Sequence, residues 1–339
     1  MARPFLGTAD ITVSELGFGA ASIGNLYRRV TTELAHQTVD CAWQHGIRHF
    51  DTAPYYGFGL SERRLGDVLR ERDGYVLSTK VGRLLEPRAA AEDKYGFCSP
   101  MPFEPVYDYS YDAVMRSFED SQQRLGLSKI DIIYMHDIGR LTHGDKNEAL
   151  FKIAMDGGYK AMHELREQGL VKAIGLGVNE YEVCEEALQY GDFDCFLLAG
   201  RYTLLEQGAL QTFLPICEAR KISIIIGGPF NSGVLAAGTK SSKRPTYNYA
   251  PASDEIMSRV ASIERCCDRF DVPLAAAALQ FPLAHPTVVS VIPGMGTAAH
   301  VENIVALMNT EIPDALWSSL RDVNLLDDTA PVPGQSPKK

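Results

Sequence analysis

Residues 46–57 read Gly46-Ile47-Arg48-His49-Phe50-Asp51-Thr52-Ala53-Pro54-Tyr55-Tyr56-Gly57, and residues 60–66 read Leu60-Ser61-Glu62-Arg63-Arg64-Leu65-Gly66. This stretch predicts a short strand over 49–52, then a loop, then a helix with Ser61 as its N-cap. An acid at a strand end and a tyrosine in the loop that follows both face one mouth of an α/β barrel, where loops carry chemistry. The stretch therefore predicts a fold and part of a site.

The same unit repeats along the chain. Apolar segments typical of buried strands occur at 16–19, 49–52, 76–80, 130–136, 173–178, 195–198, 222–226 and 288–292. Helical spacing of apolar residues occurs between them, at 32–44, 61–72, 112–125, 158–168, 181–189, 208–220, 254–270 and 273–284. Short strands that alternate with helices favour a parallel sheet, and eight of them favour an α/β fold of the (β/α)8 TIM barrel type. Residues 5–13 add an N-terminal β-hairpin that turns around 8–10.

The length of the chain sets the domain organisation. Its 339 residues, 45% of them hydrophobic, suffice for one large barrel with a filled core. We expect a single barrel domain over 1–328 and a Pro-rich, disordered tail over 329–339. The connections 83–110 and 137–157 are long for a barrel, which is typical of active-site lids or of subunit contacts in a homo-oligomer.

The charge of the chain argues against two classes of partner, and its cysteines and apolar runs indicate its compartment. The net charge of -10 argues against nucleic acid and against an anionic membrane surface, so we expect a small-molecule partner. The seven cysteines form no CxxC pair, and several lie in apolar periodic stretches, as expected of reduced core residues. The sequence shows no signal-peptide pattern and no apolar run long enough to span a membrane, so we expect a cytoplasmic protein.

Four polar residues follow consecutive strands: Asp51, Tyr56, Lys80 and His136. In a barrel all four point at the same mouth. An ammonium lowers the pKa of a nearby phenol, and a carboxylate keeps that ammonium charged and in place, so Tyr56 becomes a candidate general acid and base. Each residue alone also fits a structural role, as a surface lysine, a core histidine or a loop cap. Their joint placement at strand ends favours catalysis.

These motifs resemble the aldo-keto reductases. The matching segments, in order, are 50–57, 78–80 and 134–137, and the resemblance spans nearly the whole chain. It implies the (β/α)8 fold, a nicotinamide cofactor bound without a Rossmann domain, and a catalytic tetrad of Asp51, Tyr56, Lys80 and His136. The implied roles match the chemistry above: Tyr56 is the acid or base, Lys80 and Asp51 tune it, and His136 orients the substrate oxygen.

Further segments resemble one branch of that family. Residues 158–162, 175–180, 199–207 and 227–235 look like the aldose 1-dehydrogenases, which include L-fucose dehydrogenases and are similar to pyridoxal 4-dehydrogenases. The resemblance implies oxidation of a cyclic hemiacetal, such as L-fucose, D-arabinose or pyridoxal, to a lactone. A broad NADPH-dependent aldehyde or ketone reductase is the alternative function. A non-catalytic, nucleotide-binding regulatory subunit is a minor one.

The resemblance also implies a cofactor site. Backbone amides over 228–232 are expected to bind the pyrophosphate, a use that suits glycine-rich turns. The adenosine-phosphate loop over 291–303 has no Lys or Arg between 293 and 303, which favours NAD over NADP because a 2′-phosphate needs charged donors. His300 or a distant arginine remains able to compensate. No metal is expected. The implied cofactor-binding residues are Asn179, Gly228, Phe230, Ser232, Gly294, Met295 and Asn303.

Substrate selection is assigned to residues at the barrel mouth. The candidates are Tyr27, after the first strand, Tyr55, beside the proposed acid and base, and Arg83, after the third strand. Aromatic residues of the 83–110 connection are also within reach, and they suit a sugar ring or a planar pyridine equally. Arg201, at a strand end, fits either a substrate contact or a structural ion pair.

Overall fold

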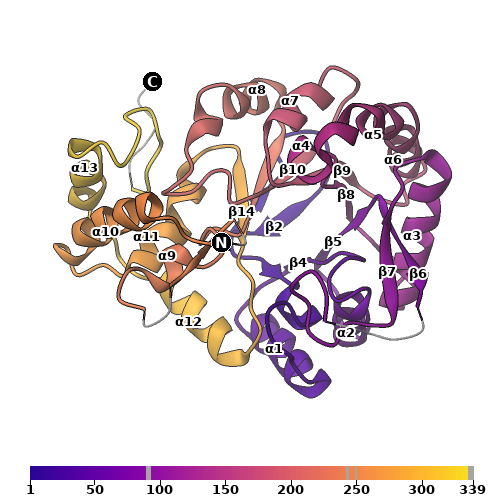
Figure 1. The fold of residues 1–339 in the computed structure, drawn as a ribbon, viewed down its shortest axis with the longest axis horizontal. Helices are drawn as coiled ribbons and strands as arrows, with labels where there is room; N and C mark the ends of the chain where they lie inside the picture. Colours follow the sequence, from indigo (N-terminus) through magenta and orange to yellow (C-terminus); the bar gives the residue numbers. More distant parts are fainter. Residues whose placement is uncertain (89–92, 242–243, 249, 335–339) are drawn as a thin grey trace.

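A computed structural model describes residues 1–88, 93–241, 244–248 and 250–334 and shows a parallel barrel (Figure 1). Neighbouring strands run in the order β14, β11, β10, β9, β8, β5, β4 and β3. The barrel strands are β3 (Phe18–Gly19), β4 (His49–Asp51), β5 (Val76–Val81), β8 (Ile132–His136), β9 (Ala173–Val178), β10 (Cys195–Ala199), β11 (Ser223–Gly227) and β14 (Val288–Ile292). Each of these strands lies on one of the eight apolar segments expected from the sequence, so the predicted (β/α)8 fold is confirmed.

The barrel closes between its first and last strands. Parallel bridges join Leu16 to Val291 and Gly19 to Gly294. The amide of Gly17 donates to the carbonyl of Val291 at 2.8 Å, and the amide of Val291 donates to the carbonyl of Glu15 at 2.8 Å. Closure removes both sheet edges and brings the carboxyl ends of all the barrel strands to one mouth.

Helices cover the outside of the barrel. Those that follow the expected segments are α1 (Thr32–Gln44), α2 (Leu60–Leu69), α3 (Tyr111–Leu125), α6 (Tyr159–Glu167), α7 (Glu182–Ala187), α8 (Phe213–Arg220), α10 (Asp254–Asp268) and α11 (Leu274–Gln280). The hydroxyls of Thr31 and Ser110 cap α1 and α3 by accepting from backbone amides. No helix in the described ranges is long and apolar enough to cross a membrane.

The predicted N-cap of α2 is wrong. The cap is Gly59, at φ +96°, and Ser61 already lies inside the helix. The hydroxyl of Ser61 donates to the carbonyl of Ala20 at 2.8 Å and bonds the Thr52 hydroxyl at 2.8 Å. Ser61 therefore ties α2 to the ends of two strands, a contact between distant segments that outweighs the local capping preference.

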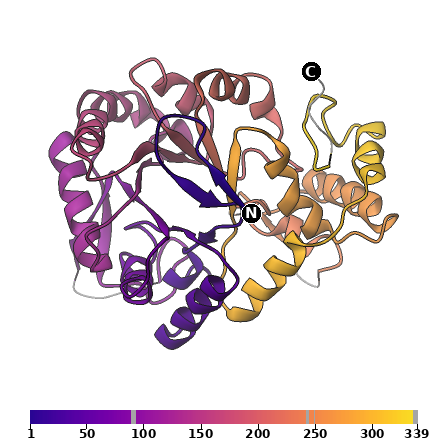
Figure 2. The ribbon, with the colours of Figure 1, turned by 180° about the vertical axis from the view of Figure 1, so that it is seen from behind.

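A hairpin closes the end of the barrel opposite the mouth. It pairs β1 (Ala2–Pro4) with β2 (Thr12–Ser14), so the predicted N-terminal hairpin is confirmed with its strands further from the turn than expected. Figure 2 shows it lying across this side of the barrel. Phe5, Ile11 and Val13 are buried and pack into the core inside the barrel. The hairpin excludes water from that core.

The long connections carry structure of their own. The 83–110 connection forms a hairpin of β6 (Arg83–Pro87) and β7 (Phe103–Tyr107), and 137–157 contains α4 (Arg140–His143) and α5 (Asn147–Ile153). Later segments form α9 (Val234–Ala237), β12 (Thr246–Tyr247), β13 (Ala250–Pro251), α12 (Ala298–Met308) and α13 (Asp314–Asp322). Ala330 and Val332 are buried in the core, so packing extends beyond 328. The last five residues of the predicted tail, 335–339, lie outside the described residues.

Candidate active site

A buried ion pair lies at the mouth of the barrel. Lys80 Nζ, near the end of β5, is 2.7 Å from Asp51 Oδ2 at the end of β4 and also donates to the carbonyl of Thr52 at 2.9 Å. The hydroxyl of Ser78 donates to Asp51 Oδ1 at 2.8 Å. Asp51 is 2% exposed and Lys80 1%. Because both charges are shielded from water and held by hydrogen bonds, the ammonium has a fixed position.

Tyr56 lies beside this pair. Lys80 Nζ is 4.7 Å from the centre of the Tyr56 ring. Burial alone lowers the pKa of Lys80, but the Asp51 carboxylate raises it above its ordinary value, so the lysine stays charged. Burial raises the pKa of Tyr56, and the Lys80 ammonium opposes this. The expectation that Lys80 lowers the pKa of Tyr56 therefore holds for that interaction, but burial outweighs it.

His136, at the end of β8, completes the cluster. Its ring centre is 6.1 Å from that of Tyr56, with the two rings nearly perpendicular. His136 is 6% exposed. Burial, Arg83 and Lys80 hold its pKa well below the ordinary value, so the imidazole is neutral. A neutral imidazole offers one donor and one acceptor, which suits the orientation of a hydroxyl or carbonyl oxygen.

Arg83 joins the cluster through Asp137. Its guanidinium pairs with Asp137 Oδ2, and Asp137 Oδ1 accepts from Asn179 Nδ2 at 3.1 Å. The guanidinium carbon lies 4.0 Å from the centre of the Tyr55 ring and 4.8 Å from that of Tyr107. Arg83 is therefore a buried cation fixed by one carboxylate and two aromatic faces, on the connection for which the sequence left open an active-site lid or a subunit contact.

Two cavities meet at Tyr56. One, of about 490 Å³, lies between the ends of β3, β11 and β14, and the other, of about 400 Å³, lies under the β6–β7 hairpin. Asp51 lines the first, and Lys80 and His136 line the second. The residues that line both cavities are Ala21, Leu26, Tyr27, Tyr56, Leu197 and Ala199. A group held at this junction contacts the contents of both cavities.

The first cavity contains most of the predicted cofactor residues. Its lining includes Gly228, Phe230, Ser232, Gly294 and Asn303. Asn179 lines the second cavity, together with the predicted substrate residues Tyr55, Tyr27 and Arg83. Met295 is not among the lining residues: its side chain is fully buried in the core.

The first cavity suits a dinucleotide. Gly228, Asn231, Ser232 and Gly233 all have positive φ, between +47° and +100°, so the chain turns tightly around one end of the cavity. Such turns direct backbone amides at anions. Ala199 and Gly227 face each other in register and both line the cavity, so its wall carries no bulky side chain at either position.

An arginine lies near the far end of the first cavity. A Cβ on Gly296 would lie 3.0 Å from Arg28 Nη2, so the exposed Arg28 side chain rests on the 293–303 segment. His300 lines this end, with its pKa lowered by burial and by Arg28. His300 and Asn303 belong to α12 rather than to a loop, because the helix begins at Ala298 behind the cap Thr297. The distant arginine considered from the sequence is thus present.

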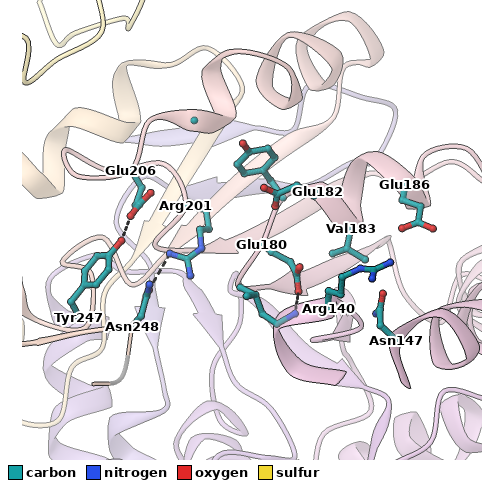
Figure 3. A pocket seen from close by; sticks show the side chains of 13 residues that line it. Arg140, Asn147, Glu180, Glu182, Val183, Glu186, Arg201, Glu206, Tyr247 and Asn248 are labelled. Atoms are coloured by element: carbon teal, nitrogen blue, oxygen red, sulfur yellow. Dashed lines mark hydrogen bonds between the residues drawn. The ribbon is translucent and has the colours of Figure 1, made fainter. Parts of the chain in front are cut away.

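Arg201 makes structural contacts. Its Nε donates to the carbonyl of Asn179, and its Nη1 lies 3.1 Å from Asn248 Oδ1. It lines a separate cavity of about 560 Å³ beside the ends of β9 and β10, where Figure 3 also shows the Tyr247 hydroxyl bonded to Glu206. Arg201 does not line either cavity that meets at Tyr56. The sequence left open a substrate contact or a structural ion pair, and these hydrogen bonds instead join Arg201 to neutral backbone and amide oxygens.

Tyr109 was not singled out by sequence reasoning as a positioning residue. Its hydroxyl donates to the carbonyls of His136 at 2.9 Å and Asp137 at 3.1 Å. It thereby holds Asp137 at φ +50°, in the backbone conformation that lets its carboxylate reach Arg83. The sequence signal was weak, because Tyr109 was one aromatic residue among several in a long connection.

The barrel, the Asp51–Lys80 pair and a tyrosine between two cavities define an oxidoreductase that uses a nicotinamide cofactor and acts on CH–OH groups. A model of the aldo/keto reductase family matches residues 15–325, and the chain belongs to that family. It is 43% identical to a pyridoxal 4-dehydrogenase of Microbacterium luteolum over 95% of this chain and 97% of that protein. It is 37% identical to a D-threo-aldose 1-dehydrogenase of a Pseudomonas species over 96% of this chain and 98% of that protein.

Solved structures agree with the fold. The holo form of an aldo-keto reductase from Bacillus halodurans superposes with a TM-score of 0.74, at 25% identity and 99% coverage of both chains. A glycerol dehydrogenase from Gluconobacter oxydans superposes with the same TM-score at 18% identity, covering 99% of this chain and 98% of that one. These likenesses support the barrel fold over nearly the whole chain.

Proposed function

We propose that the protein oxidises a cyclic hemiacetal, either an aldose at C1 or pyridoxal, to a lactone with NAD. The position of Tyr56 carries this proposal: it lines both the cavity suited to a dinucleotide and the aromatic cavity under the β6–β7 hairpin. A single acid and base at that junction reaches a substrate hydroxyl and leaves the carbon that bears it facing the cofactor cavity.

Each residue of the tetrad has a separate role in the proton transfer. When bound, the nicotinamide ring supplies the acceptor for the hydride that leaves the substrate carbon. Tyr56 accepts the hydroxyl proton, and the Lys80 ammonium stabilises the phenolate that receives it. Asp51 keeps that ammonium charged, and neutral His136 orients the substrate oxygen. In reduction the same proton returns from Tyr56.

The cofactor contacts belong to the same proposal. Residues 228–232 would hold the pyrophosphate, Gly294 and Asn303 would lie along the adenosine half, and Asn179 would face the nicotinamide carboxamide. The turn of positive-φ residues supports the first of these roles, since it surrounds the end of the cavity where an anion is expected.

The second cavity supports a ring-shaped, oxygen-rich substrate. Tyr55, Phe97 and Tyr107 supply flat apolar walls, and Arg83 supplies donors held in place by Asp137. Aromatic faces pack against a sugar ring or a pyridine ring, and a guanidinium donates to their hydroxyl oxygens. The activities in the names of the two relatives above, on pyridoxal and on threo-aldoses, fit this chemistry.

A second candidate is an NADP-dependent enzyme, including the broad aldehyde or ketone reductase. One observation favours it: Arg28 rests on Gly296 beside His300, where a 2′-phosphate would find a cation. NAD remains the proposed cofactor because the 293–303 segment itself supplies no lysine or arginine.

Initial rates at 340 nm test the function. The purified protein is given NAD or NADP with pyridoxal, L-fucose, D-arabinose, L-xylose and L-galactose in turn. We expect NAD reduction with at least one substrate and a loss of roughly 100-fold or more in Tyr56→Phe. NADPH oxidation by simple aldehydes alone would support the reductase instead. No change in absorbance with any combination of cofactor and substrate, despite measurable nucleotide binding, would support the regulatory subunit.

A further inference from the structure

A cluster of three metal-binding side chains lies on the outside of the barrel, where α1 and α12 lie side by side (Figure 1). Cys41 and His45 are four residues apart along α1 and its C-cap, so they face the same side. Glu302 projects from α12. The sulfur, the imidazole nitrogen and the carboxylate oxygen all lie within 4.8 Å of one another.

The donor set has a defined chemical preference. A thiolate, an imidazole and a carboxylate together match the ligands of zinc, whose bonds to these atoms are about 2.0–2.3 Å. A tetrahedral set with such bonds places its ligand atoms about 3.3–3.8 Å apart. Closing the cluster to that spacing needs a movement of about an ångström. His45 and Glu302 are exposed, so rotation of their side chains supplies it at small cost.

One side of the cluster is buried and the other side faces solvent. Cys41 is 9% exposed, and its sulfur lies 3.8 Å from the carbonyl of Ala298 at the start of α12. His45 and Glu302 flank it at the surface. Three protein ligands around a solvent-facing opening leave the fourth position of a tetrahedral ion to water. In the described residues no other trio of His, Cys, Asp and Glu side chains was found with this spacing.

We propose that Cys41, His45 and Glu302 bind a zinc-like divalent cation that links α1 to α12. Cys41 releases its proton to solvent as its sulfur binds the ion, and no redox change accompanies the step. The site is separate from the tetrad. It shares α12 with the cofactor cavity, because His300, Asn303 and Ile304 of that helix line the cavity. The sequence predicted no metal, because Glu302 lies far along the chain from the two ligands of α1.

Cobalt and zinc titrations of the full chain test the site. Co²⁺ bound to a thiolate gives a ligand-to-metal absorption in the near ultraviolet that carboxylate and imidazole sites lack. Zn²⁺ affinity is measured by calorimetry and by the rise in melting temperature. The variants are Cys41→Ser, His45→Gln and Glu302→Gln. The matched control is Cys98→Ser, which changes a partly buried thiol that does not belong to the cluster.

The expected result is one Co²⁺ per chain with a thiolate band that zinc displaces and that Cys98→Ser retains. Cys41→Ser should abolish the band, and the other two variants should weaken Zn²⁺ affinity at least tenfold while melting like the metal-free wild type. Absence of the band in wild type would overturn the proposal. So would a band that survives Cys41→Ser, or unchanged affinity in both His45→Gln and Glu302→Gln, since the thiol would then act alone or elsewhere.

Discussion

Replacement of Lys80 by methionine removes the ammonium beside Tyr56 and keeps most of the side-chain volume. With the ring centre taken as the site of the phenolate charge, 4.7 Å from Lys80 Nζ, the two charges interact by about 3.5 kcal/mol at an effective dielectric constant of about 20. An energy of that size lowers the phenolate fraction at fixed pH roughly 400-fold. Oxidation should therefore slow by two to three orders of magnitude.

The pH dependence of kcat/KM for oxidation is the assay. In wild type the rate should rise as pH increases through the pKa of Tyr56, and in Lys80→Met the same rise should move to higher pH. The variant leaves Asp51 buried without its cation, so a melting curve must show that it remains folded. Lys80→Met/Asp51→Asn removes that stray charge and should show the same displaced profile. A folded variant with wild-type kcat/KM and an unmoved profile would refute the role of Lys80.

Three further outcomes are expected. Arg28→Ala should lower kcat/KM with NADP by about tenfold and leave that with NAD within about twofold, since only a 2′-phosphate meets the guanidinium; an equal loss with both cofactors would contradict this. Arg83→Lys keeps the charge beside Asp137 but loses the planar fork, so substrate KM should rise about tenfold with NAD KM unchanged. Burial lowers the pKa of His49 to about 3, so below pH 6.5 the unfolded chain binds a proton at His49 and the native chain does not. Urea unfolding should then show a free energy of unfolding that is insensitive to His49 above pH 6.5. Below pH 6.5 it should fall by about 1.4 kcal/mol per pH unit from His49 alone, and a flat profile from pH 6.5 to 4.5 would count against the buried neutral form.

The fold was predictable because its signal is local. Most barrel strands lie in apolar runs that are buried on both faces, and a run such as 173–178 differs from its surroundings whatever it packs against. The β6–β7 hairpin and the start of α12 at Ala298 were not anticipated. Their sequences show no clear period, and their conformation depends on packing over a mouth that other segments build.

The site also combines residues that local sequence patterns predict with contacts between distant segments that they do not predict. Asp51, Lys80 and His136 could be brought together from the sequence because each ends or follows a recognisable strand, and strand ends of a barrel converge. The contact of Arg28 with Gly296 and the approach of Glu302 to within 4.8 Å of Cys41 join opposite ends of the chain, and no local pattern encodes them. The effect of burial on the pKa of Tyr56 was missed for a related reason: burial is a property of the assembled barrel.

The seam between Leu16 and Val291 sets the order in which the protein becomes competent during synthesis. The first strand is made early, but its partner across the seam is made near the end, so the barrel cannot close until most of the chain has left the ribosome. The cavity proposed to hold the cofactor has Gly19 on one side of that seam and Gly294 on the other. A nascent chain therefore contains the tetrad residues long before this cavity is complete, and under the proposed function it would bind its cofactor only after synthesis and barrel closure.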